Sequence, residues 1–169
     1  MQIKLATPED IPALMTMVRR VVPMMRAAGN LQWNDDYPNA EIFLRDIGRG
    51  QLWVAEVDAV IAGVTAMTTD EEPDYIQADW DTTQPALVIH RLAVDPTFRG
   101  AGVARALLFK AEEVAISQNL FVVRADTNNE NQAAQRLFPS LGYRFAGEIS
   151  LRIRPGQRFF CYEKQLSQT

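Results

Sequence analysis

Two glycines, Gly100 and Gly102, stand directly in front of an apolar helical pattern in the stretch DPTFRGAGVARALL. A strand that enters a helix through such a turn leaves unpaired backbone amides at the helix N-terminus, where the helix dipole adds positive potential. Phosphate is the usual ligand of a site of this kind. The turn is therefore a candidate phosphate site, although close packing of a helix on a strand would also explain the glycines.

Two phosphate-binding motifs fit this turn poorly. A P-loop needs a longer loop that ends in Gly-Lys-Ser/Thr, and here both the lysine and the hydroxyl are missing. The dinucleotide motif needs a third glycine, but Arg105 stands in its place, and the turn lies past the middle of the chain. The sequence therefore argues against γ-phosphate chemistry and against a dinucleotide-binding fold.

His90 interrupts the apolar run ALVIHRLAV that precedes the turn. An imidazole changes its charge near neutral pH, which makes His90 a candidate general base. Alternation along a strand would place it on one face with Leu92, and would place Arg91 on the opposite face in an ion pair. A histidine in an apolar strand is equally well explained as a hydrogen-bonded core residue.

The hydrophobic periodicity predicts the elements that must hold these residues. The predicted strands are QIKL, QLWVAEV, VIAGVTAMTT, ALVIHRLAV, LFVVRAD, GYRFAGEISLRIR and RFFCYEKQL. The predicted helices begin at Pro8, after Asn39, after the glycine turn and near Asn131, and the acidic segment Asp70–Pro85 is expected to be a surface loop.

Strand, glycine turn, helix and strand follow one another in the middle of the chain, which is the order of a βαβ unit with parallel strands. Hairpins precede and follow this unit. The expected fold is therefore α/β, with a mixed, mostly antiparallel twisted sheet of about seven strands and about four helices.

The bulk composition limits the classes of partner. The chain has 169 residues, 47% of them apolar, which suits a single domain over residues 1–169. Its formal net charge of −4 opposes binding to nucleic acid or an anionic membrane. One cysteine and one histidine exclude an internal disulfide and a dedicated metal site. No segment reads as a signal peptide or membrane span, which predicts a cytoplasmic protein, and a homodimer is compatible with the sequence.

The glycine turn resembles the acetyl-CoA signature of the GNAT family of N-acetyltransferases, Gln/Arg-x-x-Gly-x-Gly/Ala. HRLAVDP is similar to the family's fourth strand, and NENQAAQRLFPSLGYRFAGE resembles its segment Asn-x-x-Ala-x-x-x-Tyr-x-x-x-Gly-Phe. The order of the predicted elements is also the family's order. The matching positions are Arg99, Gly102, Ala104, Asn131, Ala134, Gly142 and Tyr143.

The resemblance implies an acyl-CoA N-acyltransferase-like fold, with acetyl-CoA as the acyl donor and no metal. Backbone amides of the turn would bind the pyrophosphate, and the pantetheine arm would run beside the fourth strand. The implied cofactor-binding residues are Leu92, Ala93, Val94, Arg99, Gly100, Ala101, Gly102, Val103, Ala104 and Asn131.

The implied activity is transfer of an acetyl group to a primary amine of a small molecule or a protein, by direct attack in a ternary complex. Strand amides near Leu92 and Ala93 would stabilise the oxyanion, and His90 would accept the proton that a protonated amine must lose. Phe138 stands where many members have the tyrosine that protonates the thiolate, so the general acid is unassigned. The alternative is a catalytically idle acyl-CoA-binding or regulatory module.

The acceptor site would be walled by aromatic residues of the connecting segments. Trp33, Tyr37 and Trp80 are the candidates for substrate binding, with Tyr75 nearby in sequence. Loop aromatics can also act as simple lids over the core. The acidic charge of Asp70–Asp81 favours a cationic amine as the acceptor, whose identity the sequence leaves open.

Overall fold

The computed structural model describes residues 1–167. Its strands are β1 (Gln2–Leu5), β2 (Leu52–Val57), β3 (Val60–Thr68), β4 (Leu87–Val94), β5 (Val122–Asn128), β6 (Arg144–Ser150) and β7 (Arg158–Gln165). Its α-helices are α1 (Ile11–Ala27), α2 (Ala40–Gly48), α3 (Val103–Ser117) and α4 (Gln132–Ser140). Short 3-10 helices, η1 (Pro8–Asp10), η2 (Pro73–Gln77) and η3 (Pro96–Phe98), lie in the connections.

All of these strands join one sheet in the order β1-β2-β3-β4-β5-β7-β6. The neighbours β4 and β5 run parallel, and each other adjacent pair is antiparallel. The parallel pair is joined by α3, as the βαβ order requires. The predicted fold class is therefore confirmed.

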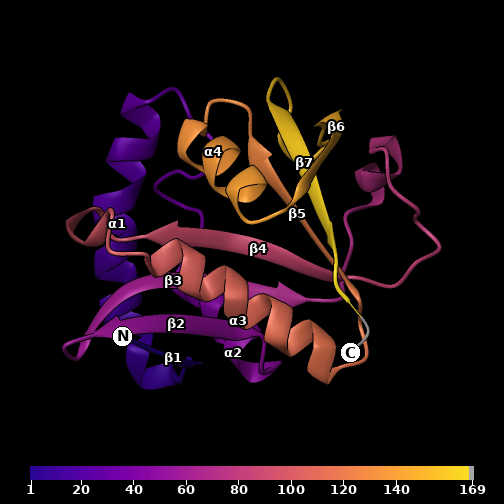
Figure 1. The fold of residues 1–169 in the computed structure, drawn as a ribbon. Helices are drawn as coiled ribbons and strands as arrows, with labels where there is room; N and C mark the ends of the chain where they lie inside the picture. The colour runs from indigo at the N-terminus through magenta and orange to yellow at the C-terminus, as the bar shows by residue number, and fades with distance from the viewer. Residues whose placement is uncertain (168–169) are drawn as a thin grey trace.

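Helices cover both faces of the sheet (Figure 1). The helices α1 and α2 lie behind the first strands in this view, and α3 crosses the front of β2, β3 and β4. The apolar stripe of α1, which includes Leu14, Met17 and Val21, packs with Phe43 of α2 and Val54 of β2. On the other face α3 and α4 meet over β4 and β5 in a second cluster around Leu108 and Phe138. Helices therefore pack against both faces of the sheet.

The first helix begins later than the pattern predicts. Pro8 begins the 3-10 helix η1, and α1 follows from Ile11. The carboxylate of Asp10 accepts a hydrogen bond from the Thr7 amide at 2.8 Å. Pro23 lies inside α1 without dividing it. In residues 1–167 no helix is both long enough and apolar enough to cross a membrane.

The acidic segment between β3 and β4 is more than the surface loop expected from its composition. The side chain of Tyr75, in η2, is only 1% exposed and packs with Val88, Ile149 and Phe159. The composition of the segment did not indicate this buried residue, because a single large side chain can hold an otherwise polar loop against the core. The loop is consequently packed against the core through Tyr75.

Candidate active site

The glycines of the turn are required by backbone conformation and not by close packing. Gly100 and Gly102 have φ angles of +79° and +78°, in the left-handed region that glycine adopts without strain. A Cβ atom built on either residue would meet no heavy atom within 4 Å. The space over the turn is therefore open.

Close packing of helix on sheet uses a different glycine. A Cβ atom on Gly63 of β3 would lie 2.7 Å from Cγ1 of Val103 and 3.1 Å from the carbonyl oxygen of Ala93. The close-packing explanation therefore applies to Gly63 and not to the glycines of the turn.

Four amides at the start of α3 point to what such a ligand would be. Within residues 1–167 the backbone N–H groups of Gly100, Gly102, Val103 and Ala104 have no hydrogen-bond acceptor. The amides of Arg99 and Ala101 instead donate to the carbonyls of Pro96 and Phe98 at 3.3 and 3.2 Å. Unpaired amides at a helix N-terminus attract an anion, which is the property expected of a pyrophosphate site.

A β-bulge interrupts β4 just before this turn. Arg91 has a φ of +53°, and the pairing register with β3 shifts between Val64 and Ala66. Because a bulge inserts an extra residue, the strict alternation predicted for His90 and Arg91 is wrong. His90, Arg91 and Leu92 all line the same cavity.

The strands β4 and β5 diverge, as Figure 1 shows. Their parallel pairing ends at Ile89 and Ala125. The Asp95 amide donates to the Ala62 carbonyl on β3 at 2.8 Å, so by the alternation of an antiparallel ladder Ala93 also faces β3. Leu92 and Val94 then direct their backbone polar groups toward the open side, which is the free edge that the pantetheine arm would need.

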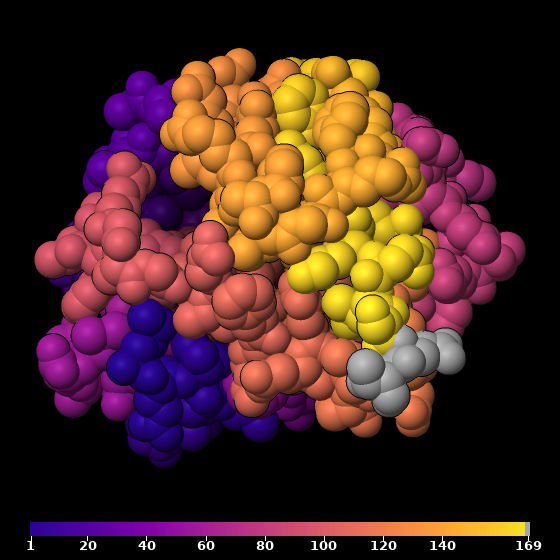
Figure 2. All heavy atoms as spheres, viewed as in Figure 1, coloured from indigo at the N-terminus to yellow at the C-terminus, as the bar shows by residue number. Residues whose placement is uncertain are grey.

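A cavity of about 110 Å³ lies where the two strands separate, room for a few water molecules or for the reacting groups of two substrates. In Figure 2 the surface is hollowed between the coral turn before α3 and the orange helix α4. Trp33, Tyr37, Asn131 and Phe138 line the cavity, together with His90. Its charged lining residues are Glu72, Arg91, Asp126 and Arg154.

The imidazole of His90 is held in a defined orientation. Its Nε2 atom lies 3.1 Å from the carbonyl oxygen of Asp70, in the loop that follows β3. A carbonyl only accepts hydrogen bonds, so Nε2 carries the proton and Nδ1 of the neutral ring is an acceptor. This arrangement is compatible with the role of general base, which stays a prediction for His90.

Asp126 is a second titratable side chain of the cavity, and the local sequence did not single it out. It follows Ala125 on β5 just as His90 follows Ile89 on β4, at the point where the pairing ends. Its carboxylate accepts a hydrogen bond from the Tyr75 hydroxyl. Burial raises the pKa of Asp126, against the opposing influence of Tyr75 and of the nearby His90 and Arg154. Ligands commonly bind beyond the carboxyl ends of parallel strands, and this rule could have identified the residue.

The aromatic candidates divide between the cavity and the core. Trp33 is 3% exposed and Tyr37 accepts a hydrogen bond from Arg91 Nη1 at 3.3 Å, and both line the cavity. Arg91 is also paired with Asp46 of α2 at 2.8 Å. Trp80 does not line the cavity, because it packs edge-on against Tyr75. Of the three acceptor-site candidates, the structure brings two together.

The helix α4 contributes Asn131 and Phe138 to the cavity. The side-chain oxygen of Asn131 caps the helix by accepting the Ala134 amide at 3.2 Å. Phe138 is 2% exposed and stacks on Tyr162, with ring centroids 4.9 Å apart. Phe138 therefore contributes to the cavity a hydrocarbon ring that cannot donate a proton.

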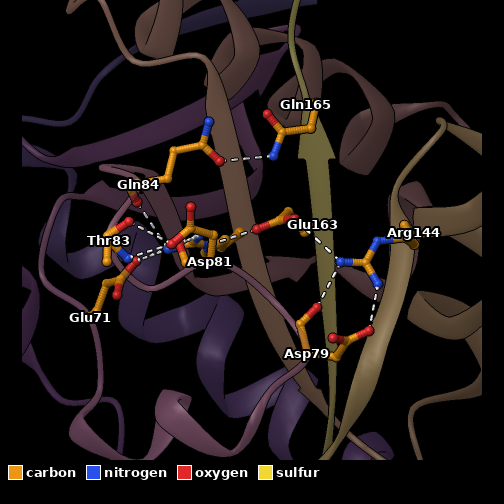
Figure 3. A network of polar contacts seen from close by, with 9 residues as sticks. Glu71, Asp79, Asp81, Thr83, Gln84, Arg144, Glu163 and Gln165 are labelled. Carbon is orange, nitrogen blue, oxygen red and sulfur yellow. Dashed lines mark hydrogen bonds and ion pairs between the residues drawn. The ribbon is translucent and has the colours of Figure 1, made fainter.

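The fully buried guanidinium of Arg124 ties the β3–β4 loop to the sheet. Its Nε atom donates to Glu163 at 2.9 Å, and its terminal nitrogens reach Glu71 and the carbonyls of Asp81 and Gln84. Figure 3 shows these partners around one centre, with Arg144 contacting Glu163 from the far side. This network fixes the loop that supplies the Asp70 carbonyl to His90 and Tyr75 to Asp126.

A thiol nucleophile and a metal site are two further possibilities to examine. Cys161 is buried on β7, and burial raises the pKa of its thiol to about 12, which suits a packing residue rather than a nucleophile. In residues 1–167 no three His, Cys, Asp or Glu side chains are grouped so that they could hold a metal ion.

Known proteins resemble this chain in sequence and in fold. The model of the Acetyltransferase (GNAT) family matches residues 19–143. N-acetylaspartate synthetase from Homo sapiens is 31% identical over 116 residues, which cover 69% of this chain and 35% of that protein. The chain thus spans about a third of the length of this relative and of its counterpart from Rattus norvegicus.

Solved structures resemble the whole chain. A GNAT-family acetyltransferase from Streptococcus agalactiae is 26% identical with a TM-score of 0.84, covering 99% of this chain and 96% of the other. The structure of yncA from Salmonella typhimurium, which holds its cofactor acetyl-CoA, is 19% identical with a TM-score of 0.71, covering 100% and 95%. This second likeness concerns the fold alone.

Proposed function

Because this chain belongs to the GNAT family of acetyltransferases, we propose that it transfers an acetyl group from acetyl-CoA to a primary amine. The observation that carries the proposal is the set of four unpaired amides at the start of α3, which adjoin the free edge of β4. The amides suit a pyrophosphate, and the edge suits the amide-containing pantetheine arm. Together they lead from the surface to the cavity that holds His90.

The residues of this chain supply binding and proton transfer to the reaction. The amide of Leu92, on the open side of β4, is the donor available for the developing oxyanion, because Ala93 faces β3. Nδ1 of His90 accepts one proton of the acceptor ammonium and passes it to solvent. The nearby carboxylate of Asp126 stabilises the ammonium group of the acceptor as it enters the cavity. It also stabilises the imidazolium of His90 that forms after the proton transfer.

The covalent step is a substitution at the thioester carbonyl. The neutral amine nitrogen forms the new N–C bond, and the C–S bond breaks with its electron pair on sulfur. The second proton of the nitrogen reaches the thiolate through water, which gives the CoA thiol and the N-acetyl amine. Water must act as the carrier because Phe138 supplies no proton.

Replacing Gly102 with glutamate should weaken binding of acetyl-CoA by at least about tenfold, because it puts a negative charge among the amides that bind the pyrophosphate. Calorimetric titration with acetyl-CoA measures the change. Gly102→Ala carries the same backbone strain without the charge and should lose less. Gly50→Glu, at another open glycine with a φ of +66°, is the distant control. Equal affinity of Gly102→Glu and Gly50→Glu would contradict the pyrophosphate assignment.

Installing a hydroxyl by Phe138→Tyr should change kcat by less than about threefold near neutral pH. A thiol is only modestly basic, so departure of the thiolate does not need a strong acid. The check is kcat between pH 6 and 9 at saturating acetyl-CoA, with thermal unfolding recorded because a buried hydroxyl without a partner destabilises. A hundredfold gain would overturn protonation through water.

A further inference from the structure

Arginines from other elements pair with several carboxylates of the acidic loop. Asp70 pairs with Arg49 at 3.6 Å, Asp74 with Arg152 at 2.9 Å and Asp79 with Arg144 at 3.1 Å. Glu71 is bound by the buried Arg124. The net charge of the loop therefore does not by itself indicate the acceptor, and the charges that line the cavity, which include Glu72, are the better guide.

Arg154, in the connection between β6 and β7, is the unusual charge among the cavity residues. It is half-buried, and its guanidinium lies 4.5 Å from the ring centroid of Tyr37. Within residues 1–167 no carboxylate lies within ion-pair distance of it, and its one hydrogen bond goes to the carbonyl of Ile153 at 3.2 Å. A guanidinium has five N–H donors, so most of them remain available at the cavity.

The other charged groups of the cavity are arranged differently. Arg91 is engaged by Asp46 and Tyr37. Asp126 is near enough for the charge of Arg154 to lower its pKa, although burial has the larger and opposite effect. Glu72 completes the lining on the acidic side. The cavity therefore presents the carboxyl groups of Asp126 and Glu72 together with a guanidinium that, in the part of the chain that the structure describes, forms no direct ion pair.

This arrangement is complementary to a zwitterion. Asp126 and Glu72 suit an ammonium next to the proton acceptor, and Arg154 suits a carboxylate on the same small molecule. We propose that the acceptor is an amine that also carries a carboxylate, such as an α-amino acid, and that Arg154 binds this carboxylate. The proposal rests on the proposed N-acetyltransferase function and names the substrate class of its site.

Arginine is well suited to this task. A guanidinium can bind a carboxylate through two parallel N–H···O bonds, and its stacking on the Tyr37 ring restricts its orientation before the acceptor arrives. Partial burial makes the pair stronger than one in open solvent. A lysine at this position would keep the charge but lose the paired geometry.

The test compares acceptors that differ in the carboxylate alone. Acetylation of the twenty common L-amino acids is measured first, and the best substrate is then compared with its carboxamide. The ratio of kcat/KM for the acid over the amide should fall about 10- to 100-fold in Arg154→Ala, chiefly through KM, since a charged hydrogen-bond partner is lost. Arg154→Lys should recover part of the ratio. Arg152→Ala, two residues away and paired with Asp74, should leave it unchanged.

The outcomes separate this proposal from the function on which it rests. If amines without a carboxylate, such as tyramine or spermidine, are acetylated and amino acids are not, the substrate class is wrong and the N-acetyltransferase function stands. An acid-to-amide ratio that is equal in the parent protein and in Arg154→Ala would also overturn the role of Arg154. If acetyl-CoA binds but no amine of either kind is acetylated, the proposed function fails, and the acceptor class fails with it.

Discussion

Replacing His90 with glutamine is expected to lower kcat by about 10²- to 10⁴-fold, the usual contribution of a general base. Glutamine can still donate from its side-chain amide to the Asp70 carbonyl, which now accepts from Nε2 at 3.1 Å. What it cannot do is accept a proton from an ammonium. The effect should therefore appear in kcat, with the affinity for acetyl-CoA changed by less than about threefold.

The measurement is kcat against pH for the parent protein and for His90→Gln, with acetyl-CoA affinity determined by calorimetry. Asp126→Asn is the matched variant, because Asp126 stands at the corresponding position of β5. The loss of kcat in Asp126→Asn should be smaller than in His90→Gln, because Asp126 stabilises charge near His90 and does not itself take the proton. If His90→Gln kept the parental rate while Asp126→Asn lost it, the base would be Asp126 and His90 would be a structural residue.

Arg124→Met is expected to lower the free energy of unfolding by about 3–5 kcal/mol, because it leaves a buried carboxylate without its partner. Glu163 is 6% exposed and would retain only the weaker contact with Arg144 at 3.5 Å. The carbonyls of Asp81 and Gln84 would also lose their donor. For a chain of this length the midpoint of thermal unfolding should fall by on the order of 10 °C.

Urea denaturation followed by circular dichroism measures this change, with a surface pair as the control. Arg158 and Glu148 lie 2.8 Å apart on β7 and β6 but are 51% and 41% exposed. Arg158→Met should therefore cost less than about 1 kcal/mol. Arg124→Met combined with Glu163→Leu should recover part of the loss by removing the orphaned charge. Equal destabilisation by Arg124→Met and Arg158→Met would show that the buried network contributes nothing special.

The parts of the fold that depend on local sequence could be predicted well. Asn39 caps α2 through a bond to the Ile42 amide, and the apolar periodicity of α1 and α3 places each helix on its face of the sheet. The order of β4, glycine turn, α3 and β5 fixes a parallel pair whichever residues lie elsewhere. These features arise from residues close together in the chain.

The cavity was harder to predict because it is assembled from distant segments. Tyr75 and Asp126 are 51 residues apart, and nothing in either local pattern indicates that they meet. The sequence places Arg154 at the end of a predicted strand, which is wrong, because β6 ends at Ser150 and Arg154 lies in the connection to β7. The bulge at Arg91 was also missed, because a left-handed φ at a non-glycine residue leaves no mark in a hydrophobic pattern. A prediction of which face a strand residue occupies, made from strict alternation, fails wherever a bulge inserts one residue.

The contact between the Asp70 carbonyl and His90 has an evolutionary consequence. A backbone oxygen belongs to every amino acid, so the residue at position 70 can vary among descendants of this gene without changing the tautomer of His90. What selection must preserve is the path of the chain, and that path is held from a distance by Arg124 and Glu163. A family comparison would then find invariance at the two buried charges and variation at position 70, although position 70 is the one that contacts the imidazole of His90.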